Sequence, residues 1–174
     1  MTQPELAEHL TRFLGEGQRA AQLDRGVELW RYERPEFVTF ATRGLSDLDV
    51  AALKPQELVC SVLPGQDGAA AQLVTVLFEQ ILATDRGPVV PQLIPNTTPI
   101  LDRTQIHGLL ATGHPYLDEA FDAITRDGTV TVQLVTLIPL TGTEVSQAQT
   151  SGLDSLMDAL EATDPALLDV TRAG

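Results

Sequence analysis

The chain has 174 residues, a formal net charge of −13, 43% hydrophobic residues and 20% charged residues. These values predict one soluble globular domain over residues 1–174 and exclude a disordered chain or a membrane-spanning protein. Residues 1–87 carry a net charge of −5 and residues 88–174 carry a net charge of −8, and a negative field disfavours nucleic acid and anionic lipid as partners.

Residues 1–14 lack the basic patch of a signal peptide, and the single cysteine, Cys60, excludes an intrachain disulfide, so we expect a cytoplasmic protein.

The N-terminal residues 1–17 predict an amphipathic helix. Thr2 and Glu5 have the spacing of a capping box, in which each side chain bonds a free backbone N–H of the other residue. Apolar residues at positions 6, 10, 13 and 14 then share one helical face, and glycines at 15 and 17 break the pattern.

The next segment predicts the first strands of a sheet. Residues 27–32 and 37–42 are rich in strand-forming residues, and the short stretch with Pro35 between them is typical of a turn. Residues 57–63 predict a third strand that ends at Pro64-Gly65. We therefore expect a hairpin followed by another strand.

The second half alternates helices and strands less regularly. Residues 69–82 are apolar over so wide an arc that we expect a largely buried helix. Residues 88–99 contain four prolines, which exclude a helix and permit an edge strand or an extended, mobile or binding loop. Residues 130–140 are apolar on both faces and predict a central strand, and helices over 143–149 and 153–161 complete an α+β domain.

No spacing among the histidines and the cysteine is typical of a metal or cofactor site. His9, His107, His114 and Cys60 do not form the short ligand pairs that zinc sites usually show. The glycines around Glu16 lack the third glycine and the preceding strand of a phosphate-binding loop. We expect neither a metal nor a cofactor.

A hydrolase would need a histidine, a carboxylate and a nucleophile in contact. The candidates are His107 or His114, Asp118 or Glu119, and Ser61 or Cys60. No nucleophile-elbow pattern surrounds Ser61 or Cys60. His114 is more simply a loop residue before a proline, His107 the start of a strand, and Cys60 a small buried hydrophobe. We therefore predict that the chain is not an enzyme.

A second candidate site is a run of acidic residues. It consists of Asp118, Glu119, Asp122 and Asp127. Such a run is either a solvated face or a contact for a cation or a basic partner, and the sequence leaves these alternatives open.

Several motifs occur in an order that resembles the suppressor-of-fused domain family over roughly residues 27–160. Residues 37–40 have the sequence Phe-Val-Thr-Phe, residues 43–47 Arg-Gly-Leu-Ser-Asp, and residues 57–59 Glu-Leu-Val. The stretch 127–144 begins with Asp-Gly, continues through an apolar strand to Leu-Ile-Pro-Leu-Thr, and ends at a glutamate. The positions that carry the resemblance are Thr39, Gly44, Ser46, Asp47, Glu57, Gln133, Pro139 and Glu144.

These positions also have physical interpretations that require no function. Gly44 suits a turn with positive φ, and Ser46 or Asp47 can cap the following turn. Glu144 stands where a carboxylate favours a helix N-terminus.

The resemblance implies an α+β domain with a mixed, mainly antiparallel sheet packed against helices, which binds proteins and catalyses nothing. Short bacterial members of the family include some that look like immunity proteins, and the near absence of lysine fits a bacterium with a GC-rich genome. The leading hypothesis is a cytoplasmic binding protein of suppressor-of-fused type, with an immunity protein whose acidic face covers the basic cleft of a toxin as its specific form. The alternatives are a regulatory scaffold that captures a peptide on a sheet edge near residues 88–99, and a small hydrolase that uses His107 or His114.

Overall fold

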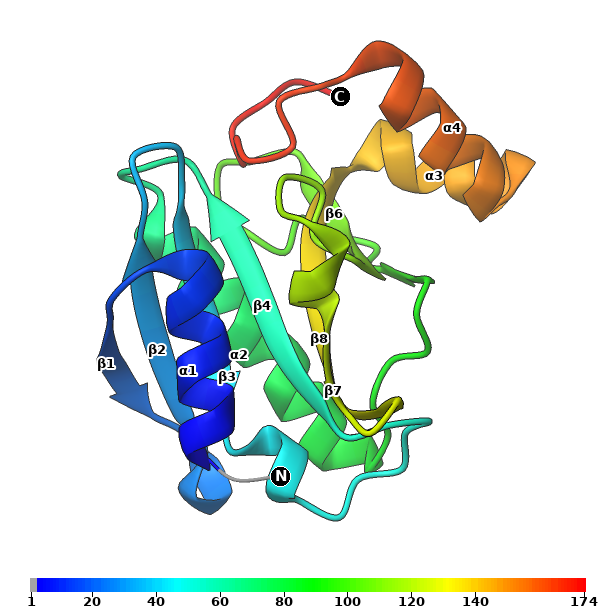
Figure 1. The fold of residues 1–174 in the computed structure, drawn as a ribbon. Helices are drawn as coiled ribbons and strands as arrows, with labels where there is room; N and C mark the ends of the chain where they lie inside the picture. The colour runs from blue at the N-terminus through cyan, green and yellow to red at the C-terminus, as the bar shows by residue number, and fades with distance from the viewer. Residues whose placement is uncertain (1–2) are drawn as a thin grey trace.

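One eight-stranded sheet organises the computed structural model, which describes residues 3–174 (Figure 1). The strands are β1 (Gly17–Gln22), β2 (Glu28–Glu33), β3 (Val38–Arg43), β4 (Gln56–Val62), β5 (Gln92–Pro95), β6 (Ile106–Thr112), β7 (Ala123–Arg126) and β8 (Thr129–Thr141). Their order is β1-β2-β3-β4-β8-β6-β5, with β7 also paired to β8. All pairs are antiparallel except β4 with β8. The predicted α+β class with a mixed, mainly antiparallel sheet is confirmed.

Four α-helices pack on this sheet. They are α1 (Gln3–Leu14), α2 (Asp67–Thr84), α3 (Gly142–Ser151) and α4 (Leu153–Thr163). In Figure 1, α1 lies in front of the sheet, α2 lies behind it, and α3 and α4 stand together beyond one end of β6 and β8. Within residues 3–174, none of the helices combines the length and hydrophobicity needed to span a bilayer.

The N-terminal helix is shorter than predicted. It ends at Leu14, and Gly17 already begins β1, a strand that the sequence did not predict. A Cβ at Gly17 would overlap the ring of Tyr32 on β2, so the glycine lets the two strands approach. Thr2, the predicted first partner of the capping box, lies outside the described residues.

Strand β8 lies at the centre of the sheet, as its two apolar faces predicted. Gln133 pairs with Gln56 of β4 and with Ala123 of β7. Farther along, Thr136 pairs with β4 and β6. Strands β6 and β7 therefore follow one another along the same edge of β8, and the chain leaves the sheet between them. We call residues 113–122 the crossing loop.

Three hydrophobic clusters hold the layers together. Helix α2 packs its buried face, including Leu73 and Phe78, on one face of the sheet. Helix α1 and Phe121 of the crossing loop cover the other face, and α3 and α4 cover the last part of β8. Each fully buried leucine or phenylalanine contributes roughly 1.5–3 kcal/mol, so these clusters fix the positions of the loops between them.

Candidate functional site

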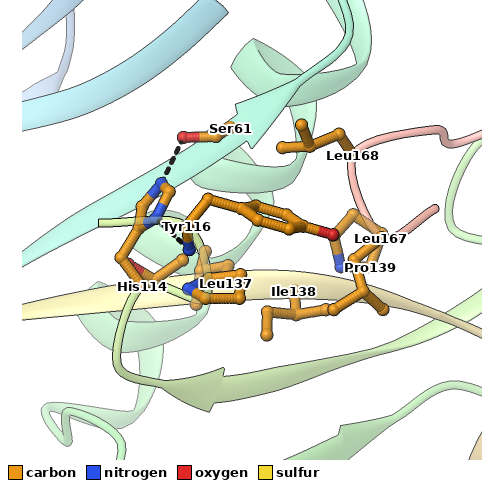
Figure 2. Close-up of a pocket in the computed structure, with 10 residues that line it drawn as sticks. Ser61, His114, Tyr116, Leu137, Ile138, Pro139, Leu167 and Leu168 are labelled. Atoms are coloured by element: carbon orange, nitrogen blue, oxygen red, sulfur yellow. Dashed lines mark hydrogen bonds between the residues drawn. The ribbon is translucent and has the colours of Figure 1, made fainter. Parts of the chain in front are cut away.

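The crossing loop carries His114 into the core, where its side chain contacts Ser61 of β4. The ring Nε2 lies 2.8 Å from Ser61 Oγ, and Nδ1 accepts the backbone N–H of Tyr116 at 3.1 Å (Figure 2). A neutral imidazole that accepts at Nδ1 carries its proton on Nε2. His114 therefore donates to Ser61 Oγ, which also lies 2.7 Å from Thr39 Oγ1.

This arrangement does not activate Ser61 as a nucleophile. A general base must accept the serine proton, but the ring presents its N–H to that oxygen. Burial, together with the positive charge of Arg34, lowers the pKa of His114 to about 4. Among residues 3–174 no carboxylate oxygen bonds the ring, and Asp122 accepts the backbone N–H of His114. The adjoining cavity of about 10 Å³ is no larger than a water molecule requires.

The other hydrolase candidates lie apart from this pair. His107 lies on β6 with its ring beside Gly142, at the start of α3. Cys60 is fully buried, as predicted, and burial raises the pKa of its thiol to about 12. Neither group forms a catalytic arrangement with His114 and Ser61.

The four acidic residues of the predicted partner site have different environments. Asp122 is half-buried inside the crossing loop, and burial raises its pKa. Asp118 caps the short 3₁₀-helix η3 (Glu119–Asp122) through the Ala120 N–H, while Glu119 and Asp127 are exposed. Within the described part of the chain, no three acidic, histidine or cysteine residues are placed to hold a metal ion. Partner contact at the three exposed carboxylates stays a prediction.

Glu57 has a structural role that the sequence did not reveal. It is completely buried at the start of β4, and its carboxylate accepts five hydrogen bonds. The donors are the hydroxyls of Thr42 and Ser46 and the backbone N–H groups of Gly44, Leu45 and Ser46. Gly44 has φ +112, as its predicted turn requires. The sequence signal was a carboxylate at the start of a mostly apolar strand.

The C-terminal motif residues are also structural. Thr141 and Glu144 form a capping box at the start of α3, which confirms the predicted helix-terminal role of Glu144. Arg172 bonds the Glu144 carboxylate at 2.7 Å and the Pro139 carbonyl at 2.6 Å, so it ties the C-terminal segment to β8. On the parallel pair β4–β8, Gln133 accepts from Gln56 Nε2 at 3.0 Å.

Strand β5 confirms the predicted edge strand among residues 88–99. The backbone N–H of Asn96 donates to the carbonyl of His107 on β6. Because backbone groups alternate in direction along an antiparallel strand, the N–H of Ile94 also points toward β6 and the N–H of Leu93 points toward the open edge. Pro91 and Pro95 have no N–H, which leaves Leu93 as the outward donor of β5. A groove of about 450 Å³ lies between this segment and α2.

A second groove, which we call the α4 groove, lies between α4, the sheet and the crossing loop. Its volume is about 350 Å³. Its apolar lining consists of Leu110, Pro115, Tyr116, Ile138, Met157, Leu160 and Leu167. Glu161 and Asp164, both exposed, lie at its rim. Sequence periodicity did not identify this groove, because its lining comes from three separate stretches of the chain, 110–116, 138 and 157–167.

The fold and these sites define an α+β domain whose buried polar residues hold loops and termini in place, and whose open features are grooves and exposed carboxylates. The family model of suppressor of fused protein (SUFU) matches residues 25–173, and the chain belongs to this family. The matched region extends beyond the residues 27–160 that carry the sequence resemblance.

Solved structures have the same fold. A suppressor of fused homologue from Neisseria gonorrhoeae FA 1090 is 16% identical with a TM-score of 0.66, over 99% of this chain and 95% of that chain. A chain of the Sufu-Fu complex is 11% identical with a TM-score of 0.65, over 98% of this chain and 97% of that chain. No curated protein sequence matches significantly.

Proposed function

We propose that this chain is a non-catalytic protein-binding domain of suppressor-of-fused type, and that it acts as an immunity protein against a basic toxin domain. Family membership supports the first part, since one solved relative is a complex of Sufu with Fu. The buried His114–Ser61 pair agrees with it, because the histidine donates to the hydroxyl that a hydrolase would deprotonate.

The observation that carries the proposal is the surplus of acidic side chains, since the chain has 24 Asp and Glu residues against 11 Lys and Arg residues. The arginines in ion pairs within residues 3–174 are Arg19, Arg31, Arg34, Arg126 and Arg172. By contrast, Asp118, Glu119 and Asp127 form no ion pair within the described part of the chain. Exposed carboxylates without internal partners attract a basic surface and accelerate encounter with it.

A tagged pull-down, washed at low and at high salt, tests for a protein partner. We expect one stoichiometric protein that survives the high-salt wash, with a basic toxin domain as its binding part. Recovery of a stoichiometric partner without a basic surface would contradict the immunity role. Recovery of no protein would contradict protein binding altogether.

The acidic contact is tested with the recovered partner and a matched pair of variants. Asp118→Asn with Glu119→Gln should slow association about tenfold at low salt, because it removes two charges that attract the partner. Asn still caps η3, so the fold is retained. Glu79→Gln with Asp85→Asn makes the same charge change at an exposed position of α2 and at its exposed C-cap, and it should have little effect. Equal slowing by both variants would exclude a specific contact at Asp118 and Glu119.

A peptide-capturing scaffold remains the second candidate, because β5 has an open edge beside a groove. An added strand would bond the outward N–H of Leu93. Leu93→Pro should then weaken binding far more than Leu93→Ala, since both remove the side chain but only proline removes the donor. Equal effects of the two substitutions on partner affinity would rule out strand addition at β5.

A further inference from the structure

We propose that the α4 groove binds a segment of the partner protein that presents a large apolar side chain next to an arginine or lysine. The inference rests on the proposed protein-binding function and specifies a surface and a partner chemistry for it. The groove is separate from the β5 edge and is built from different elements.

The floor of the groove fits an apolar side chain. Leu110 and Ile138 of adjacent strands form the base, and Met157 and Leu160 of α4 form one wall. Tyr116 of the crossing loop also lines the groove and is 41% exposed, which makes it one of the few large hydrophobic side chains on the described surface. The volume of about 350 Å³ is at the lower end of the range for small-molecule pockets, so one or two side chains fill it.

The rim specifies the charge of the occupant. Glu161 lies in the last turn of α4, and Asp164 is the C-cap residue, with φ 44. Both are negative at the negative end of the helix dipole, where cations are favoured. The last turn of α4 contains no basic residue, and the nearby Arg172 is occupied by Glu144 and Pro139. Charge complementarity therefore calls for a cation supplied by the partner.

The same charges exclude other classes of occupant. Carboxylates at the rim repel the phosphates of nucleic acids and anionic lipids. A peptide segment offers an apolar side chain and a neighbouring guanidinium or ammonium group a few ångströms apart. This pairing matches the apolar floor and the acidic rim at once.

Methyl NMR provides the test, because the sequence has only two methionines, Met1 and Met157. The full chain carries ¹³C-methyl methionine and is titrated with a synthetic acetyl-Arg-Leu-Phe-Arg-amide peptide. Two control peptides replace either both arginines by glutamates or both apolar residues by serines. We expect a saturable shift of the Met157 methyl signal with the first peptide and at least about tenfold weaker binding of each control.

A charge variant links the shift to the rim. Glu161→Gln with Asp164→Asn should weaken binding of the arginine peptide about fivefold and leave the fold intact, since both side chains are exposed. Glu79→Gln with Asp85→Asn is the matched control, because Asp85 is the C-cap residue of α2 with φ 58; it should bind like the wild type.

Two results would overturn the inference. One is a Met157 signal that does not move with the arginine peptide or that moves equally with the glutamate peptide. The other is a protein partner that binds the wild type and the Glu161→Gln, Asp164→Asn variant with equal affinity. This second result would leave the proposed protein-binding function standing.

Discussion

The replacement His114→Gln should remove a large part of the pH dependence of stability. The ordinary pKa of histidine is 6.5, whereas burial lowers the pKa of His114 to about 4 in the folded chain. Below pH 6.5 the unfolded chain binds a proton that the folded chain excludes, so stability falls as the pH decreases toward 4. A tenfold difference in proton affinity is worth ~1.4 kcal/mol, so the wild type should lose about 3 kcal/mol between pH 7 and pH 4 through this residue.

The assay is urea unfolding of the wild type and the variant at several pH values from 7 to 4. Glutamine keeps a donor for Ser61 Oγ but does not titrate, and all other groups, including His9 with its lowered pKa, are common to both proteins. The stability difference should therefore change by about 3 kcal/mol in favour of the variant as the pH falls. A His107→Gln control keeps His114 and should retain the wild-type loss. Parallel curves for the wild type and the His114→Gln variant would refute the reasoning.

Three further substitutions or measurements test the buried groups. Arg172→Leu should lower the free energy of unfolding by about 3 kcal/mol, because it leaves the Glu144 carboxylate without its cation, whereas Arg19→Leu at an exposed pair should change it by under about 1 kcal/mol. Glu57→Gln should cost about 2–4 kcal/mol in chemical denaturation, because the amide places a donor against donors of the loop after β3; unchanged stability would contradict the assigned role. Cys60 should react with a thiol reagent at least about a thousandfold faster in denaturant than in the native chain, and fast native labelling would contradict its burial.

The long, strongly patterned elements could be predicted from the sequence. The apolar arc of α2 and the two apolar faces of β8 each have a single structural solution, which is burial in the core. Strand β1 could not be predicted, because its residues are polar or small and almost fully exposed. Its position depends on pairing with β2 and on the space above the Tyr32 ring.

The candidate sites were predicted only in part. The sequence offered both His114 and Ser61 as candidates, and the fold brings them into contact. The tautomer that prevents activation depends on the Tyr116 N–H, which no spacing reveals. The backbone N–H groups that donate to Glu57 likewise belong to a loop more than ten residues earlier in the chain. Such contacts are set by tertiary packing, and local patterns do not encode them.

The single parallel pairing in the sheet has a consequence for how the chain folds. Strands β1 to β4 form a series of sequential antiparallel neighbours, and β5 to β8 form a second group, so the β4–β8 pair is the seam between two locally connected halves. Forming the β4–β8 pair joins Gln56 to Gln133 across a long intervening chain, which lowers the conformational entropy of that chain. Contacts between the two halves offset this loss only when both halves are already folded. We expect substitutions at the seam to accelerate unfolding and to leave the folding rate nearly unchanged, whereas substitutions in the β2–β3 hairpin slow folding. Stopped-flow kinetics would reveal the opposite order if the seam formed first.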